Sequence, residues 1–356
     1  MRVSSKKLLG ILKRSLTPNR PYHAQWLLTR RCNYRCRGCN VWNERQHDKE
    51  MPTDEVKKGL DALRKLGVVE IVLSGGNPLL RSDIGEIIDY SSRFFVTTVY
   101  DNGSMAIEKI DALRNADFVA ISLDTLNEEK FDYIRGVRGA WKTAINAIET
   151  LHEKGIQVGV SPTISQLNLY EIIDFTKHFI DRDIPVWYCL YSYDYPSENP
   201  LFTIGKKQDE FEIADKEGMA KVCDTLIEMK KKYEGVYITT KTLLALKHLF
   251  QNDQRTWKCK ALQGFLMVDH LGRVAGCHRN EPVASIFELP EVWDSQRLEG
   301  LRQKYSECTQ CAYLCYIFYS IHSDVKSNLD ILRDQWKNIR LLLADKHSMG
   351  RLNSTT

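Results

Sequence analysis

The sequence predicts an α/β protein, a partial barrel of six strand–helix units followed by a small cysteine-rich α+β extension. Between residues 23 and 192, short runs rich in Val, Ile, Phe and Thr alternate with longer amphipathic stretches. Such alternation is typical of βαβ units around a parallel sheet. Six units are too few for a closed eight-stranded barrel, so we expect a partial, TIM-like one. Five of the ten cysteines crowd between residues 259 and 315.

The predicted strands of the barrel are short and separated by helical stretches such as Thr53–Leu66 and Trp141–Lys154. Parallel strands end at the same edge of a sheet, so residues that follow them directly should gather there. The strands are His23–Thr29, Glu70–Ser74, Phe95–Tyr100, Phe118–Leu123, Gln157–Thr163 and Val186–Leu190.

Residues 1–22 predict a basic amphipathic helix. Leu8, Leu12 and Leu16 recur at helical spacing, and the first 20 residues hold six basic side chains and no acidic one. Pro18 ends the helix. Two interpretations stay open: packing on the body of the protein, or contact with an anionic membrane surface.

Beyond residue 192 the pattern changes. Residues 193–255 predict a loop and connecting helices, including a charged helix over 208–233 that carries Cys223 as a packed thiol. The cysteine-rich segment 256–320 contains two predicted strands, Phe265–Asp269 and Arg273–Cys277, joined by a tight turn. A final helix and a polar tail make up 321–356. The resulting segments are 1–22, 23–192, 193–255, 256–320 and 321–356.

Composition excludes several classes of protein. The 50 Lys and Arg residues against 46 Asp and Glu give a net charge of +4, which is too small to indicate a nucleic-acid partner. No stretch is apolar enough to predict a transmembrane helix or a signal peptide. We therefore expect a cytoplasmic protein, peripheral at the inner face of a membrane if the N-terminal helix binds lipid. In a reducing compartment, ten cysteines favour metal binding over disulfides.

Cys32, Cys36 and Cys39 lie directly after the first predicted strand. Three thiolates within eight residues can bind one face of an iron–sulfur cube and leave its fourth iron open. Structural zinc requires four ligands, which this segment does not offer. The loop lies at the carboxyl end of a barrel strand, where such folds carry out their chemistry. The cysteines therefore predict a reactive iron–sulfur site.

This CxxxCxxC spacing resembles the signature of the radical S-adenosylmethionine (SAM) superfamily. Three further segments are similar to that family's motifs and follow the next strands in order. They are Ser74-Gly75-Gly76-Asn77-Pro78, similar to a GGEP segment; Asp101-Asn102-Gly103; and Ile121-Ser122-Leu123-Asp124 with the later Arg135.

The resemblance implies that Gly75, Gly76, Asn77, Asn102, Ser122 and Arg135 bind SAM. Asn77 stands where the family usually has Glu, which leaves a backbone role. Arg135 would pair with the SAM carboxylate, since a guanidinium can bind it bidentately. The alternative for Ser122 and Arg135 is ordinary polar surface. Gly38 also departs from the family, because a bulky residue is usual before the third cysteine.

Downstream, the cysteines resemble the opening of a SPASM domain, or rather its shorter "twitch" form with one auxiliary [4Fe–4S] cluster. Our first choice of ligands is Cys259, Cys277, Cys308 and Cys311, with Cys315 as an alternative ligand or a spare thiol. A four-cysteine zinc site is the other possibility.

His278 follows Cys277 and could act as a base near neutral pH, although a surface histidine is the preferred interpretation. Cys189, at the end of the sixth strand, is either buried or a hydrogen donor to a radical.

The resemblance implies a radical enzyme. A reductant such as flavodoxin or ferredoxin would reduce the open cluster, SAM would be cleaved to a 5′-deoxyadenosyl radical, and that radical would take hydrogen from an unactivated C–H bond. The basic N-terminal helix favours a membrane lipid or isoprenoid substrate. Alternatives are a peptide, a small molecule or carbohydrate, and a non-enzymic two-cluster electron-transfer protein. A long apolar tunnel would indicate lipid, and a wide polar cleft would indicate a peptide.

Overall fold

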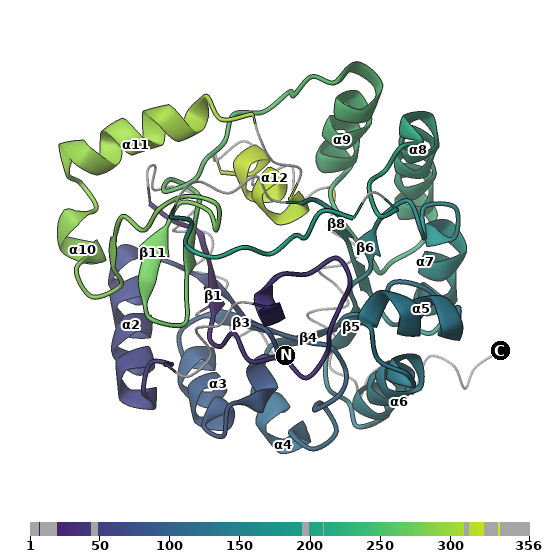
Figure 1. Cartoon of the computed structure of the whole chain (residues 1–356), viewed down its shortest axis with the longest axis horizontal. Helices are drawn as coiled ribbons and strands as arrows, with labels where there is room; N and C mark the ends of the chain where they lie inside the picture. Colours follow the sequence, from purple (N-terminus) through teal and green to yellow (C-terminus); the bar gives the residue numbers. More distant parts are fainter. Residues whose placement is uncertain are drawn as a thin grey trace.

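The computed structural model describes residues 7, 20–43, 49–193, 199–208, 210–309, 313–323 and 334. Parallel strands form the centre, and helices surround them (Figure 1). The barrel strands are β1 (His23–Leu27), β2 (Glu70–Ser74), β3 (Val96–Asp101), β4 (Phe118–Ile121), β5 (Val158–Val160), β7 (Val186–Trp187) and β9 (Val236–Tyr237), with the small pair β6 (Thr163–Ile164) and β8 (Cys189–Leu190). Among the described helices, none is long and apolar enough to cross a bilayer.

The helices outside the strands are α2 (Thr53–Leu66), α3 (Ile84–Ser92), α4 (Ile110–Leu113), α5 (Glu128–Arg135), α6 (Ala140–Glu153), α7 (Ile172–Ile180), α8 (Lys216–Lys232) and α9 (Thr240–Asn252). Short 3₁₀ turns, η1 (Val41–Asn43) and η2 (Pro78–Leu80), follow the first two strands. The sheet order β12-β11-β10-β1-β2-β3-β4-β5-β7-β9 is parallel from β10 to β9, which confirms the predicted α/β class and partial barrel.

The alternation of side chains along β1 and β2 separates two environments. Trp26, Ile71 and Leu73 are fully buried and point away from the barrel axis. Trp26 lies so close to α2 that a Cβ on Gly59 would be 2.5 Å from its ring. The alternate positions of both strands face inward instead. The period of two thus divides each strand between a packed outer face and the barrel interior.

Two elements of the segment 193–255 differ from expectation. The charged helix begins at Lys216 rather than at residue 208, because the Asp215 side chain accepts a hydrogen bond from the Gly218 amide at 2.8 Å and caps it there. A short strand, β9, was not predicted; two residues are too few to produce a periodic signal. Cys223 is buried on α8, as expected.

The cysteine-rich segment continues the barrel's own sheet. Its predicted hairpin is present as β10 (Phe265–Val268) and β11 (Arg273–Ala275), and Gly272 takes a positive φ of 74° in the turn. β10 pairs in parallel with β1, and β12 (Ala284–Ser285) adds beyond β11. Helices α10 (Leu289–Val292) and α11 (Gln296–Ser306) follow.

Helix α12 (Leu314–Ile321) covers the open side of the barrel. It lies between the β10 side and the β8–α9 side (Figure 1). Tyr313, before its first turn, donates to the Ser192 carbonyl at 3.3 Å, and Tyr319 donates to Glu70 at the start of β2. The helix therefore runs from the carboxyl ends of the strands to their amino ends.

Lys7 is the one described residue before Arg20. Its ammonium donates to both oxygens of Asp117 at 2.8 and 2.6 Å, and the two side chains are 8% and 3% exposed. This buried ion pair packs Lys7 against the barrel. The rest of the predicted helix within 1–22 lies outside the described residues, as does most of the predicted final helix in 321–356.

We expect Lys7→Ala to lower the free energy of unfolding by about 3 kcal/mol, because it leaves the buried Asp117 carboxylate without its counter-charge. Denaturant titration measures this. Arg20→Ala is the matched control, since its ion pair with Asp294 is exposed and should contribute less than about 1 kcal/mol. Equal losses in the two variants would contradict the packing of Lys7.

Candidate active site

The loops at the carboxyl ends of β1 to β4 surround a space of about 140 Å³. The three predicted cluster cysteines line it together with most of the predicted SAM-binding residues. The lining includes Cys32, Cys36, Cys39, Gly76, Asn102, Ser122 and Arg135. Residues more than 100 positions apart in the sequence thus meet where the strand order places them.

Gly75 and Gly76 allow the β2 loop to lie against the cysteine loop. A Cβ on Gly76 would be 2.3 Å from the Arg31 carbonyl oxygen, and one on Gly75 would be 2.5 Å from that of Thr29. The Gly76 amide donates to the Thr29 carbonyl at 2.7 Å. Glycine is therefore required at both positions because the β2 loop lies so close to the backbone of the cysteine-bearing loop.

Asn77, at the family's Glu position, is fully buried. Its Oδ1 accepts from the Leu79 amide at 2.9 Å, and its Nδ2 donates to Asn102 Oδ1 at 3.2 Å. Asn102 in turn donates to Asn33 Oδ1 at 3.0 Å. Among the described residues that line the space, Asn77 is absent. Its side chain positions Asn102, which does line it.

Arg135 joins the site to a larger cavity, since it lines both. Its Nη2 lies 2.8 Å from Asp124 Oδ2, and its Nη1 lies 3.9 Å from Cys36 Sγ. Burial opposes the charge, but Asp124 and Cys36 raise the pKa of Arg135. Its buried Nε has no hydrogen-bond partner among the described residues. A fixed cation with a spare donor suits the carboxylate of a ligand.

Cys32 and Cys39 are poor thiolates unless a cation joins them. Burial raises the pKa of Cys32, and burial with the neighbouring Cys36 raises the pKa of Cys39 to about 12. No group of three or more His, Cys, Asp or Glu in the described part of the chain is arranged to hold a single metal ion. Three thiols around a space, rather than around a point, fit an iron–sulfur cluster.

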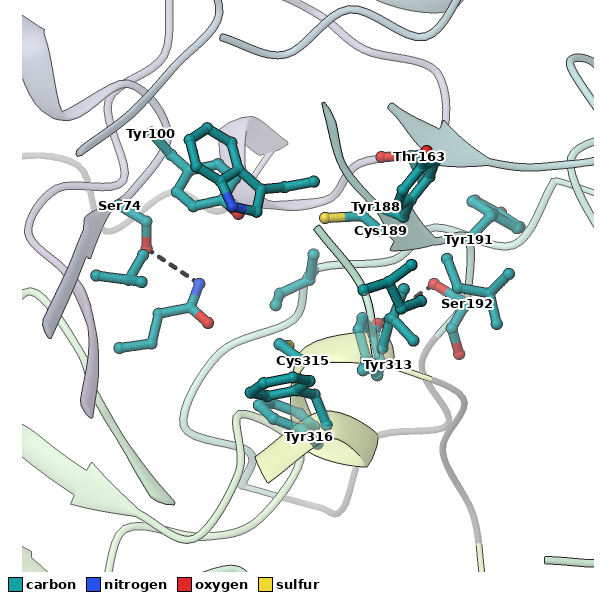
Figure 2. Close-up of a pocket in the computed structure, with 18 of the residues that line it drawn as sticks. Ser74, Tyr100, Thr163, Tyr188, Cys189, Tyr191, Ser192, Tyr313, Cys315 and Tyr316 are labelled. Carbon is teal, nitrogen blue, oxygen red and sulfur yellow. Dashed lines mark hydrogen bonds between the residues drawn. The ribbon is translucent and has the colours of Figure 1, made fainter. Parts of the chain in front are cut away.

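A cavity of about 640 Å³ begins at Cys36, Gly38 and Cys39 and follows the inside of the barrel. It reaches His23 and Glu70, the first residues of β1 and β2. Its wall is mostly carbon, with many tyrosine rings among the side chains (Figure 2). Complete barrels fill this volume with layers of branched side chains, so the interior here is open to a ligand.

Besides Cys36 and Cys39, two further thiols line this cavity, Cys189 from β8 and Cys315 from α12 (Figure 2). Cys189 Sγ lies 3.6 Å from Ser161 Oγ, and burial raises the pKa of Cys189, so the group is a neutral thiol. Cys189 thus faces the barrel, and its role as a hydrogen donor stays a prediction.

Aromatic side chains compensate for the unusual Gly38. A Cβ on Gly38 would lie 3.0 Å from the Tyr191 ring, and Tyr191 packs on Phe211 with centroids 5.2 Å apart. Both rings line the cavity beside the cysteine loop. They supply flat apolar surface where the family's bulky residue is missing.

Three of the predicted auxiliary ligands lie near one tyrosine. Burial, followed by Cys277, Cys259 and Cys308, raises the pKa of Tyr305 to about 12. Cys311 lies outside the described residues. The side chain of Cys315 lines the barrel cavity instead, which favours the interpretation of Cys315 as a spare thiol.

The expectation that His278 is a surface residue was wrong. It is 0% exposed, its Nδ1 lies 2.7 Å from the Tyr316 hydroxyl, and its ring stacks on Phe202. The chain after β11 turns inward beneath α12, an arrangement that a local sequence pattern does not reveal. Among the described residues that line the two spaces, Tyr316 is present and His278 is not. A role of His278 as a base stays a prediction, with Tyr316 between it and the cavity.

The cavity residues were largely missed by sequence reasoning. Gln25, Ser74, Thr98 and Tyr100 face inward from strands that were interpreted as buried. The available signal was the recurrence of polar residues at most alternate positions of β1, β2 and β3. The tyrosines of α12 carried no such signal.

Comparison with known proteins agrees with this geometry. The model of the radical SAM superfamily matches residues 26–178. An AdoMet-dependent heme synthase of Methanosarcina barkeri is 27% identical over 323 residues, covering 83% of this chain and 89% of that protein. The subtilosin biosynthesis protein AlbA of Bacillus subtilis is 30% identical over 166 residues, or 45% of this chain and 37% of that protein.

The fold also resembles solved structures. Streptococcus suis SuiB bound to S-adenosylmethionine superposes with a TM-score of 0.62 at 18% identity, covering 91% of this chain and 77% of that one. The fold and the cysteine site together define an enzyme that generates radicals at an iron–sulfur cluster. Residues 26–178 match the radical SAM superfamily, whose enzymes bind a [4Fe–4S] cluster and SAM.

We expect Cys36→Ala to reduce 5′-deoxyadenosine formation to background, because each of the three thiolates is needed to hold the cluster. Product is measured after anaerobic reconstitution with SAM and dithionite. Cys223→Ala, on α8, is the control and should retain the product. Undiminished 5′-deoxyadenosine from Cys36→Ala would show that this loop does not hold the SAM-binding cluster.

Cys277→Ala should lose about one cluster of iron while SAM cleavage persists at least in part, since the two sets of cysteines lie on separate segments. Cys315→Ala should keep its full iron content, because that thiol faces the cavity. Elemental analysis of anaerobically purified protein distinguishes them. Stoichiometric zinc in the parent protein, or iron loss in Cys315→Ala, would refute this ligand assignment.

Proposed function

We propose that this enzyme takes a hydrogen atom from a C–H bond of an elongated, mostly apolar substrate that lies in the barrel cavity. The observation that supports this proposal is the continuity of two spaces. Cys36, Cys39 and Arg135 line both the cluster site and the cavity. A substrate chain in the cavity would therefore lie directly beside bound SAM.

When bound, the cluster and SAM supply one electron and a 5′-deoxyadenosyl radical that takes the hydrogen atom. The residues of the chain hold and shield the reactants. Cys32, Cys36 and Cys39 would ligate the cluster, and Arg135, held by Asp124, would bind the SAM carboxylate. Aromatic rings around the cavity would exclude water from the substrate radical. The electron would come from a donor such as flavodoxin or ferredoxin.

The length of the cavity supports an elongated substrate. The cavity follows β2 from Ser74 to Glu70. These residues are four positions apart, which corresponds to roughly 13 Å at about 3.3 Å per residue. Its wall is mostly carbon, as an acyl or isoprenoid chain requires. Among the described lining residues Arg135 is the one Arg or Lys, and it is already paired with Asp124. A substrate with several carboxylates would lack partners.

A tetrapyrrole is the second candidate. The relatives named AdoMet-dependent heme synthase match 81–83% of this chain, whereas the subtilosin biosynthesis protein AlbA and the mycofactocin maturase MftC match under half. A peptide is the third, since SuiB has been solved with its precursor peptide. None of these proteins is named for a lipid. The proposed substrate is therefore defined by its elongated apolar shape, and no membrane surface is part of the proposal.

The proposal predicts transfer of deuterium from a perdeuterated chain into 5′-deoxyadenosine. Reconstituted enzyme is incubated with SAM, dithionite and perdeuterated 1-dodecanol, and the product is analysed by mass spectrometry. Val72→Trp should fill the cavity midway and reduce deuterium transfer at least tenfold, while unlabelled 5′-deoxyadenosine still forms.

Parallel incubations contain iron-coproporphyrin or a deuterated peptide. Consumption of either compound, with no deuterium transferred from the dodecanol, would show that the substrate is a tetrapyrrole or a peptide and not an elongated apolar chain. Deuterium transfer that Val72→Trp leaves unchanged would place the reacting chain outside the cavity.

A further inference from the structure

A polar cluster lies at the end of the cavity farthest from the SAM site. It consists of Tyr22, His23, Glu70 and Tyr319, which we call the Glu70 cluster. The first three precede or begin β1 and β2, and Tyr319 comes from α12. All four side chains line the cavity. They are far from the cysteine loop, so the SAM chemistry does not use them.

The contacts within the Glu70 cluster fix the carboxylate. The Tyr319 hydroxyl donates to Glu70 Oε2 at 2.9 Å. His23 stacks on the Tyr319 ring with centroids 3.9 Å apart, and its Nδ1 lies 3.6 Å from the same Oε2. Burial, then the Glu70 charge, raises the pKa of both Tyr22 and Tyr319, so both phenols stay neutral. The cluster thus presents one oriented carboxylate between two phenols and an imidazole.

The cluster has unused hydrogen-bonding capacity. His23 is 4% exposed, and its Nδ1 has no hydrogen-bond partner among the described residues. Leaving a buried polar nitrogen unpaired costs about 1–3 kcal/mol. A ligand that reaches this end would remove that cost.

We propose that the Glu70 cluster binds a hydroxyl or amine terminus of the substrate chain, an inference that rests on the proposed function. A hydroxyl or ammonium donates to the Glu70 carboxylate, and a hydroxyl can also pair with His23. A carboxylate terminus would be repelled by Glu70. Anchoring one end roughly 13 Å from Ser74 determines which carbon lies beside SAM, so the cluster acts as a ruler for the position of hydrogen abstraction.

The test compares three eight-carbon probes, 1-octanol, octylamine and octanoate, by calorimetric titration of the reconstituted enzyme with SAM. We expect the alcohol and the amine to bind at least tenfold more tightly than the carboxylate. Glu70→Gln should reduce the preference of amine over carboxylate to within about threefold. Glu86→Gln, an exposed carboxylate on α3, is the matched control and should keep the preference.

A second variant guards against misfolding. His23→Phe keeps the stack on Tyr319 and should weaken octanol binding more than octylamine binding, while thermal denaturation and iron content check the fold. Equal affinities for the three probes, unaffected by Glu70→Gln, would overturn the role of the Glu70 cluster. The proposal that an apolar chain binds in the cavity would not be affected by that result. Failure of all three probes to bind would overturn the proposed chain substrate itself.

Discussion

The alternation of side chains along β1 and β2 is the constraint on which the rest of the structure depends. Outward residues such as Trp26 and Leu73 pack against the helices and are fully buried, so stability comes from the outer layer. The inward positions are therefore not needed for core packing, and polar residues such as Gln25 and Ser74 occupy them. Gln25 donates to Ser74 at 3.2 Å (Figure 2), which satisfies both side chains without filling the volume.

Local patterns predicted the parts of the site that local sequence determines. The cysteine loop follows its strand directly, and parallel strands bring such loops to one edge. Gly76, Ser122 and Arg135 needed the family resemblance, because a glycine, a serine or an arginine alone is ambiguous. All three line the expected space.

Contacts between distant segments could not be predicted from the sequence. The parallel pairing of β10 with β1, the insertion of α12 beside β8, and the burial of His278 involve residues between 38 and 242 positions apart. No periodicity within a segment reports which distant segment it will contact. The cavity was missed for the same reason, since α12 forms one of its walls. An isolated signal was present, however: a strand with His and Gln at alternate positions is not an ordinary core strand.

The ion pair of Arg135 and Asp124 links cofactor and substrate. The guanidinium lies between the cluster site and the cavity, and Asp124 lines the cavity. A SAM carboxylate would bind the spare Nε donor of Arg135 while Asp124 keeps the guanidinium in place. Asp124 thus orients the cation that faces the cofactor and also forms part of the cavity wall. One ion pair therefore couples the SAM site to the substrate cavity.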